Sequence, residues 1–414
     1  MISSAGITRL AAIGATTALV WLSPAAAGDQ TMPGATVESV VAIAKHLNPT
    51  VAAAALDFDA AIHKISTAGV LDDPTLLLQA WNVNSQGVGQ RRIGFAQDIK
   101  LWGKYGLERD VAIADADAVK FRSRAVVVDL IAQVVAAHAE YNAGYEAVRV
   151  TREIKQRYDD ILQLLRGRYG TTSVDQQQVI RAEIEAATAE GDLVRREGQL
   201  KAAKARLNAL IGRATQAPLA TPTGFLILRN ESLAEMQLRA RTSSPLLALA
   251  GAQTRSANKS KSLADLNYYP DVTVSAIYVQ QPRVEDSGTF SLGFKAPLHR
   301  DVKDAEQLAA GARLSAAEAR AEAIRLRVDG EVADVWFAVD ALRKVLQIYT
   351  SRQLPPARSS VENARNGFQA GSSDIALIFE SERRFATVQL DLLKLRVELQ
   401  TKYAEMECLA GGSL

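Results

Sequence analysis

Few residues in this 414-residue chain have the types and spacing that chemistry requires. The only cysteine, Cys408, can neither form an intrachain disulfide nor build a cysteine-rich metal site. The four histidines are scattered without metal-ligand spacing: His46, His63, His138 and His299. No phosphate-binding loop, G-x-S-x-G or H-E-x-x-H motif occurs. The sequence therefore predicts neither an enzyme nor a cofactor.

Two acidic residues hold corresponding positions in the chain. Asp175 and Asp374 lie 199 residues apart, and each stands at the start of a long helical pattern. Negative charge in the first helical turn stabilises a helix by about 0.3–1 kcal/mol. Helix capping is therefore the first explanation for both carboxylates. Glu380 and Glu382 are expected to pair with Arg383 along one helix face.

The overall charge excludes one class of partner. The chain has 48 basic and 46 acidic side chains and a formal net charge of +2, so a nucleic acid is not an expected partner. With 48% hydrophobic and 6% aromatic residues, the composition is neither that of a disordered chain nor that of a fibrous one.

Residues 1–27 have the layout of a secretory signal peptide. Arg9 precedes an apolar stretch at 10–22, Ser23-Pro24 ends it, and small residues lead up to a cleavage site near Ala27. A membrane anchor would require a longer apolar run. No cysteine lies near this site, so we expect an exported protein that is not lipid-anchored.

The remaining chain resembles one half-molecule used twice. Asn48-Pro49 recurs as Ser244-Pro245 after 196 residues, and Ile93-Gly94-Phe95 recurs as Leu292-Gly293-Phe294 after 199 residues. A repeat of this length indicates a duplication. The expected division is a first repeat at 28–215, an extended linker at 216–230 and a second repeat at 231–414.

Both halves predict the same helices. In the first half we expect a helix at 37–66 that Asn48-Pro49 can kink, a long helix at 104–167, and a third ending near Gly212. The second half predicts helices at 232–266 and 301–366, the latter broken at Pro355-Pro356, and a last one ending before Gly411.

The last helix of each half carries a heptad seam typical of coiled coils. Its apolar residues recur every seventh position: Val179, Ala186, Leu193, Leu200 and Leu207, then Ile378, Phe385, Leu392, Leu399 and Met406. A helix of about 64 residues spans roughly 95 Å, close to the length of the two shorter helices laid end to end. These lengths predict a long cylinder.

Four short segments alternate between apolar and polar residues, at about 75–85, 90–101, 270–280 and 289–298. Their length is near what a tilted strand needs to cross a bilayer, although a half-buried sheet in a soluble domain alternates in the same way. Four strands cannot close a barrel, so closure would need several chains. Aromatic residues near strand ends are consistent with membrane girdles: Trp81, Trp102, Tyr268, Tyr269 and Tyr278.

This plan, with the segments RYGTTSVD (168–175) and LPPARSSVENARNGFQAGSSDIALIFESERRF (354–385), resembles the TolC-type outer-membrane efflux protein family. The short length, the missing lipid-anchor cysteine and the Leu-Pro-Pro-Ala break resemble most the CzcC-like branch, which serves heavy-metal efflux. The resemblance implies a mostly α fold with a small β part. As a trimer, its duplicated helix–hairpin–helix–helix plan would form a 12-stranded outer-membrane β-barrel continued by a long periplasmic α-helical barrel.

The resemblance also implies the setting of the protein. It would be a homotrimer in outer-membrane lipid, extending into the periplasm, with a periplasmic adaptor (membrane fusion) protein and an inner-membrane RND pump as partners. Its function would be a passive exit duct for heavy-metal cations. Drug efflux and type I secretion stay open as alternatives, and so does a periplasmic coiled-coil adaptor or scaffold.

In this family the turns between the long and returning helices form the periplasmic tip, where the tunnel narrows and the adaptor docks. The matching residues here are Tyr169, Gly170, Thr171, Thr172, Ser173, Phe368, Gln369, Ala370, Gly371 and Ser372. Relatives with a cation-sensitive constriction carry paired acids after the second turn. Asp374 matches the first acid, but Leu377 stands at the second. With Asp175, a trimer would hold six carboxylates near its entrance, and our hypothesis is that they favour cations.

Overall fold

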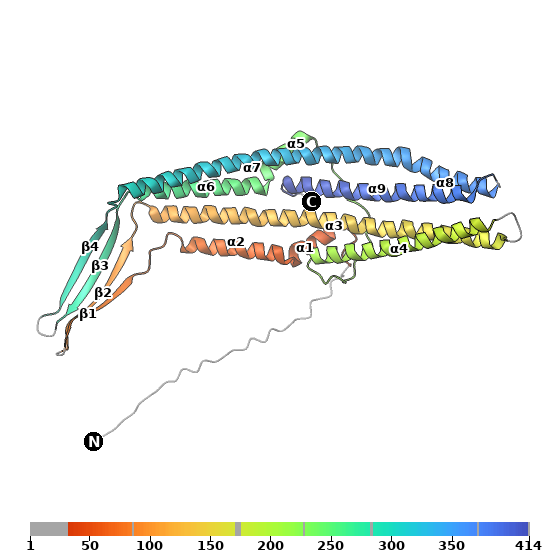
Figure 1. Ribbon diagram of the computed structural model, residues 1–414. Coiled ribbons are helices and arrows are strands. Elements are labelled where there is room, and N and C mark those ends of the chain that lie inside the picture. Colours follow the sequence, from red (N-terminus) through yellow and green to blue (C-terminus); the bar gives the residue numbers. More distant parts are fainter. Residues whose placement is uncertain are drawn as a thin grey trace, which may run out of the picture.

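The computed structural model describes residues 32–84, 87–169, 175–226, 228–281, 285–370 and 372–412. The expected signal peptide at 1–27 lies outside these residues. The chain forms a long rod of helices with a small sheet at one end, as Figure 1 shows. This arrangement confirms the expected fold class, mostly helical with a small antiparallel sheet.

The same order of elements occurs twice along the chain. The first half comprises α1 Val37–Leu47, α2 Pro49–Thr67, β1 Thr75–Asn84, β2 Gly87–Ile99, α3 Lys104–Arg168 and α4 Gln176–Leu210. The second comprises α5 Leu233–Ser243, α6 Pro245–Leu266, β3 Asp271–Gln280, β4 Ser287–Lys295, α7 Arg300–Ile348, a π-helical turn Tyr349–Gln353, α8 Leu354–Gln369 and α9 Ile375–Leu409.

Proline divides the first helix of each half. Asn48 is extended and accepts a hydrogen bond from the Thr50 N–H at 2.7 Å, and Pro49 begins α2. The helix expected at 232–266 is likewise two helices, because extended Ser244 is followed by Pro245 at the first position of α6. Proline lacks the N–H that an interior helix position would donate, so it is tolerated only in the first turn.

Among the described helices, none by itself combines the length and the hydropathy that a membrane span requires. The pair α1 and α2, bent by 49° at Asn48, reaches the required length and composition only when both are taken together.

The break expected at Pro355-Pro356 is a change of helix type. The chain passes from α7 through the π-helical turn Tyr349–Gln353 into α8, and the prolines lie in the first turn of α8. A π turn loosens the hydrogen-bond ladder by one residue, which accommodates the missing proline N–H groups. The elements α7 and α8 therefore form one long curved rod beside α6 and α9 (Figure 1).

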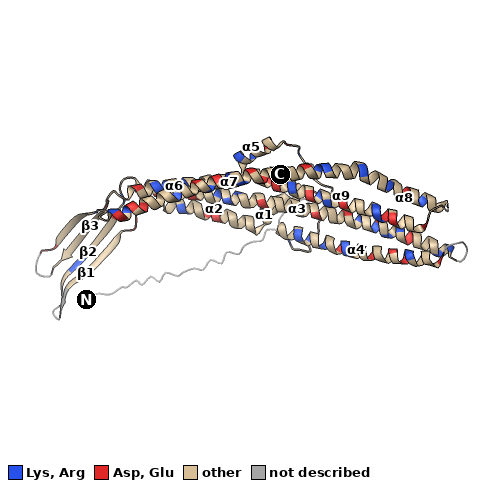
Figure 2. Cartoon of the chain, turned by 45° about the horizontal axis from the view of Figure 1, so that its top comes forward, with Lys and Arg blue, Asp and Glu red and all other residues tan. Residues whose placement is uncertain are grey.

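Helix α3 is the spine of the rod. In the half next to the sheet, α2 and α6 pack on α3, and α7 packs on α6. In the other half, α4 and α9 pack on α3, and α7 and α8 pack on α9. The helices thus form a wall, and Figure 2 shows them side by side. Within the described chain, α2 and α4 border one flank of this wall, and α7 and α8 border the other.

The two heptad seams lie inside this packing. Every seam residue of α4 and α9 is buried or half-buried, and Leu207 and Ile378 are among the most deeply buried. Residues from α3, α4, α8 and α9 form a shared apolar cluster around Tyr158 and Leu165. The expected coiled-coil seams therefore hold together the half of the rod that lies away from the sheet.

The segment before α1 and the linker between the halves bind each other and α3. The Ala220 N–H donates to the Pro33 carbonyl, and the Thr223 N–H to the Ala35 carbonyl, both at 2.9 Å. Beneath them, the His138 ring hydrogen-bonds the Gly34 carbonyl at 3.0 Å. Burial lowers the pKa of His138, which keeps this ring uncharged near neutral pH.

Each half closes with a glycine against the end of its first helix. Gly212 follows α4 with φ +73°, and a Cβ there would lie 2.6 Å from the Leu47 carbonyl oxygen. Gly411 follows α9 with φ +94°, and a Cβ there would meet the Ser243 carbonyl oxygen even more closely. Only glycine fits both the left-handed backbone and the close approach.

We expect Gly212→Ala to destabilise the fold by about 1–3 kcal/mol, because it adds both backbone strain and a clash. The measurement is thermal unfolding of the detergent-solubilised protein by circular dichroism. Gly198→Ala is the matched control, since a Cβ at this position in α4 has no neighbour within 4 Å. Equal melting temperatures for the two variants would show that the close approach carries no stability.

Candidate functional site: the sheet and the distal tip

The sheet is a four-stranded antiparallel meander in the order β1-β2-β3-β4. Its register places Leu76, Phe95, Ala276 and Phe290 in one row across all four strands. The next row on this face begins with Leu78 and continues through Ile93 and Tyr278. Because paired residues share a face, the apolar positions of all four strands line up on one side.

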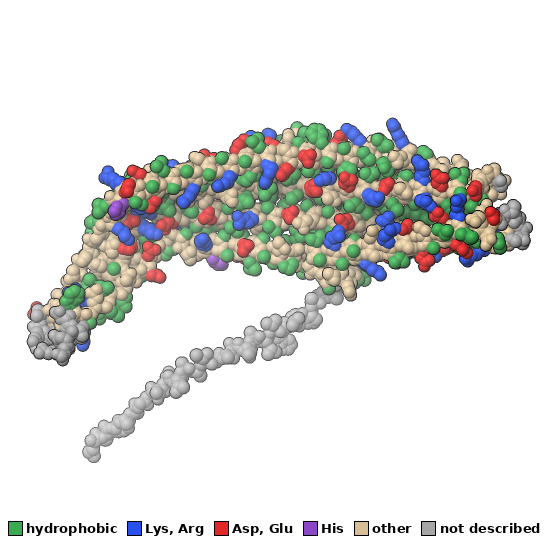
Figure 3. Space-filling model, viewed as in Figure 1, with side chains coloured by type: hydrophobic (Ala, Val, Ile, Leu, Met, Phe, Trp, Pro, Cys, Tyr) green, Lys and Arg blue, Asp and Glu red, His purple; other side chains and the backbone are tan. Residues whose placement is uncertain are grey.

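This apolar face has nothing packed on it in the described chain. Its large side chains are about half to three-quarters exposed, up to 72% for Phe290: Leu76, Leu78, Ile93, Phe95, Tyr278, Phe290, Leu292 and Phe294. Figure 3 shows hydrophobic side chains on this end of the molecule, whereas charged side chains of both signs spread along the helical rod. A contiguous exposed apolar surface indicates an interaction with membrane or protein.

The opposite face is largely polar. Asp98, Asp271, Thr273, Ser275 and Lys295 share it. Trp81 also lies on this side, because its register partner is Gln90, and the Arg92 guanidinium lies 5.4 Å from its ring centroid. Trp81 thus lies near the end of β1 on the polar face, and its place in an aromatic girdle stays a prediction.

Strands β2 and β4 end where the backbone N–H groups no longer donate to a neighbouring strand. Strand β2 ends at Ile99, two residues earlier than expected, because the Lys100 N–H donates to the Tyr105 hydroxyl and the Leu101 N–H to Asp271. Strand β4 ends at Lys295, just before Pro297, which has no N–H to donate.

Two aromatic rings lie next to each other where the sheet meets the helices. Trp102 and Tyr269 have ring centroids 5.1 Å apart, and the Trp102 indole N–H donates to the Pro270 carbonyl at 2.9 Å.

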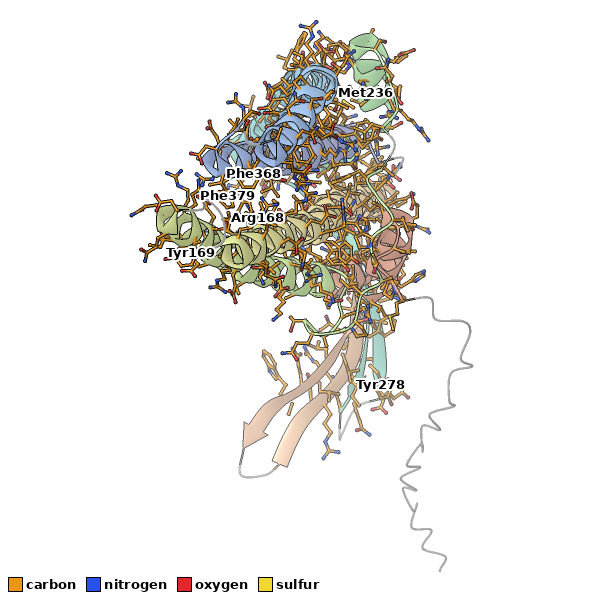
Figure 4. All side chains as sticks on the ribbon, turned by 90° about the vertical axis from the view of Figure 1, so that its right-hand side faces the viewer. Arg168, Tyr169, Met236, Tyr278, Phe368 and Phe379 are labelled. Carbon is orange, nitrogen blue, oxygen red and sulfur yellow. The ribbon has the colours of Figure 1, made fainter. Side chains whose placement is uncertain are left out.

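The tip turns lie at the far end of the rod, where Figure 4 shows Tyr169 and Phe368. Of the residues expected there, 170–173 and Gly371 lie outside the described residues. Tyr169 directly follows α3 and is about half exposed, and Phe368 and Gln369 are the last residues of α8. After Ala370, the Ser372 N–H donates to the Gly367 carbonyl at 2.8 Å.

The structure brings Asp175 and Asp374 together. Each is the extended residue immediately before its helix, α4 or α9, and neither side chain makes a capping hydrogen bond. Both line one groove of about 490 Å³, together with Arg181 and Glu185. The helix N-termini still favour the two negative charges, but both carboxylates are left to face the groove.

A buried carboxylate near the tip did not stand out in the sequence. Glu382 of α9 is fully buried and binds Arg157 of α3 at 2.8 Å and Arg365 of α8. It therefore joins three helices, and the expected pairing of Glu382 with Arg383 is wrong, because Arg383 binds Glu185 of α4. The signal was available, since Glu382 lies four residues from both Ile378 and Ala386 on the apolar face of α9.

Two aromatic rings pack beside the ion pairs of Glu382. The Tyr158 and Phe379 rings lie edge to face with centroids 5.1 Å apart, and the Tyr158 hydroxyl donates to the Phe379 carbonyl at 3.4 Å. Burial raises the pKa of Tyr158 to about 12. The hydroxyl therefore stays protonated and links α3 to α9.

A family model described as outer membrane efflux protein matches residues 40–213 and 238–412, which is most of the chain. The chain belongs to the outer membrane efflux protein family. This result confirms the expected family and the outer-membrane location, and it agrees with the expectation that the protein is not an enzyme. The CzcC-like branch stays a prediction. A comparison with curated protein sequences gave no match.

Solved structures share the fold of this outer membrane efflux protein at low sequence identity. The outer membrane protein VceC from Vibrio cholerae is 19% identical, with a TM-score of 0.76 over 91% of this chain and 96% of its own. The open state of the Neisseria gonorrhoeae channel MtrE is 16% identical, with a TM-score of 0.79 over 92% and 90%. CusC is 16% identical, with a TM-score of 0.77 over 91% and 92%.

The described part of this efflux protein holds no cluster of three or more His, Cys, Asp or Glu side chains suited to a metal ion. What the described residues offer is an apolar sheet face at one end, two groove-facing carboxylates at the other, and a helical wall between them.

We expect Glu382→Gln to loosen the tip of this efflux protein, because it leaves Arg157 and Arg365 without their shared carboxylate. The expected loss is about 1–2 kcal/mol, since both arginines are partly exposed and solvent screens them. Hydrogen exchange over α8 and the first turns of α9 is the measurement. Glu380→Gln changes an exposed neighbour and should leave exchange unchanged. If both variants exchange alike, the buried carboxylate does not hold the tip.

Proposed function

We propose that this outer membrane efflux protein is the homotrimeric exit duct of a tripartite efflux system. The observation that carries the proposal is the four-stranded sheet with an exposed apolar face, continued by a helical wall whose two flanks have no partner in the described chain. Three copies would satisfy the sheet and the wall together.

The sheet can close only between chains. Strands β1 and β4 are its two edges, and they run in opposite directions because the four strands alternate. The β4 of one copy can therefore pair antiparallel with the β1 of the next, which leaves no unpaired edge in a ring of three. The apolar face would then meet lipid, and the polar face with Asp98 and Lys295 would meet water.

The helical wall supports the same assembly. The flank of α2 and α4 exposes Leu56, Ile184 and Val194, each more than 60% accessible. The opposite flank exposes Leu308, Leu326 and Phe337 of α7. Joining one flank to the other flank of a second copy buries both sets at once.

The length of the helical wall is consistent with partners in the periplasm. Helix α3 has 65 residues, so it spans about 97 Å away from the sheet. Such a duct reaches deep into the periplasm. We infer that its tip, from Tyr169 to Asp175 and from Phe368 to Asp374, docks a periplasmic adaptor that connects it to an inner-membrane RND pump.

For the cargo we propose heavy-metal cations. The support is the resemblance to the CzcC-like branch and the two carboxylates, Asp175 and Asp374, that face one groove at the tip. Drug efflux and type I secretion are the other outcomes of a cargo test, in which the gene is deleted and sensitivity to metals and drugs is compared.

We further infer that residues 28–215 and 231–414 are structural repeats separated by the linker 216–230. The support is the recurring order of elements and the two terminal glycines, Gly212 and Gly411, which contact the ends of α1 and α5 in the same way.

The duct proposal predicts a trimer in the outer membrane that only detergent extracts. Membrane fractionation followed by cross-linking of the extracted protein measures this. A soluble periplasmic monomer would instead favour a coiled-coil adaptor or scaffold, because such a protein needs no lipid on its surface.

We expect the double variant Asp175→Asn and Asp374→Asn to lower the cation preference of the reconstituted channel, since it removes two negative charges per chain from the entrance. The reversal potential in a KCl gradient measures this. Asp160→Asn removes a charge from an exposed position on α3 that does not line this groove and serves as the control. An unchanged reversal potential in the double variant would leave the aspartates with a purely structural role at the helix starts.

A further inference from the structure

A second groove lies at the other end of the wall, where the helices meet the sheet. It has a volume of about 1010 Å³ and runs over α6, between α3 and α7. Figure 2 shows charged residues of both signs gathered at this junction. Five basic side chains line the groove: Lys104, Lys295, Lys303, Arg313 and Arg320.

The sheet register tells which side of the wall this groove opens on. Asp271 and Lys295 both line it, and they are register partners on the polar face of the sheet. The lipid-facing residues, such as Val272 and Phe294, are on the other side. On the proposed function, the groove therefore opens into the interior of the duct, and lipid headgroups do not reach it.

The three acidic side chains that line the groove, Asp115, Asp271 and Glu306, already have partners. Asp271 binds the buried Lys104 ammonium, and Glu306 binds Lys303, both at 2.8 Å. Asp115 accepts a hydrogen bond from the Ser256 hydroxyl at 2.6 Å. These contacts use two of the basic side chains and all three acids that line the groove.

The remaining three basic side chains of the groove are exposed, and two of them lie along one face of α7. Arg313 and Arg320 lie seven residues apart on α7, so they share a face about 10.5 Å apart along the axis. Both are exposed, and neither makes an ion pair within the described part of the chain. Lys295 has only a distant partner, Asp98 at 3.8 Å, and its side chain is 75% accessible.

The floor of the groove leaves room and supplies further donors. Ala250, Ala257 and Ala264 recur every seventh residue along α6, and their small side chains keep the groove open. Ser260, between the last two alanines, and Asn267, which follows α6, carry a hydroxyl and an amide group that can donate hydrogen bonds. Guanidinium groups above a floor of such donors fit carboxylate and phosphate oxygens.

We propose that this groove binds the carboxylate or phosphate groups of anionic cargo as it passes through the neck of the duct. The proposal rests on the proposed function, because that function makes the polar side of the wall the interior. In a trimer, three such grooves would form a positive band around the passage. A metal cation would then cross this level as an anionic complex, enclosed by carboxylate or phosphate ligands, and not as a bare ion.

The test measures anion block of the purified full-length trimer in planar bilayers at low salt. Citrate and inorganic phosphate are added separately to the side that carries the sheet, and the fall in single-channel current is recorded. Citrate should block the wild type, and Arg313→Gln with Arg320→Gln should raise the half-blocking concentration at least tenfold. Block should also weaken as the KCl concentration rises, because salt screens the arginines.

Two control variants separate charge from packing. Arg313→Lys with Arg320→Lys keeps the positive charge and should retain block within about threefold. Arg358→Gln removes an exposed arginine of α8, which is paired with Glu362 outside the groove, and should block like the wild type. Equal block in the glutamine double variant and the wild type would overturn the proposal, as would a wild-type channel that neither anion affects.

The outcomes also separate this inference from the duct proposal. A protein that forms no channel contradicts the duct itself. A channel that conducts without anion block contradicts only the groove. Block by citrate alone supports a binding site for polycarboxylate cargo, whereas block by phosphate at similar concentration supports one for phosphate-bearing cargo.

Discussion

The structure depends on one constraint, which is that a four-stranded sheet exposes its apolar face and both edges. In water, this surface and the unpaired backbone groups of β1 and β4 would favour aggregation. The two hairpins come from segments almost two hundred residues apart, and the duplicated order of elements brings them into one sheet through the pairing of β2 with β3. A membrane around the face and further copies at the edges would satisfy the constraint, and the helical wall would follow the same arrangement in the proposed trimer.

The helices make the sheet part of a long body because α3 touches both halves of the chain. It packs on α2 and α4 from the first half and on α6 and α9 from the second. The linker between the halves and the segment before α1 cross α3 near its middle, where its neighbours change from α2 and α6 to α4 and α9. His138 hydrogen-bonds the Gly34 carbonyl there, and the Tyr141 hydroxyl donates to the Ala220 carbonyl. The spine is therefore fixed at its middle as well as along its sides.

Periodicity in the sequence predicted most of this architecture. The seven-residue seams of α4 and α9 and the alternation of β3 and β4 are strong because one face of each element is uniformly apolar. The same reasoning failed where a single residue decides the outcome. The break at Ser244 depends on one proline. Glu382 looked like a surface charge because its partners, Arg157 and Arg365, come from helices that only tertiary packing brings near.

The π-helical turn Tyr349–Gln353 has a consequence for symmetry. Helix α3 runs unbroken from Lys104 to Arg168, whereas its counterpart in the second half changes helix type before α8. A ring of three two-repeat chains would otherwise approach sixfold symmetry. With the π-helical turn in only one of the two long rods of each chain, the tip of the proposed trimer would have threefold symmetry, and two inequivalent kinds of long rod would alternate around it. A partner that surrounds the tip with six identical subunits would have to bind in two different ways, and one that binds as three would meet a single kind of position.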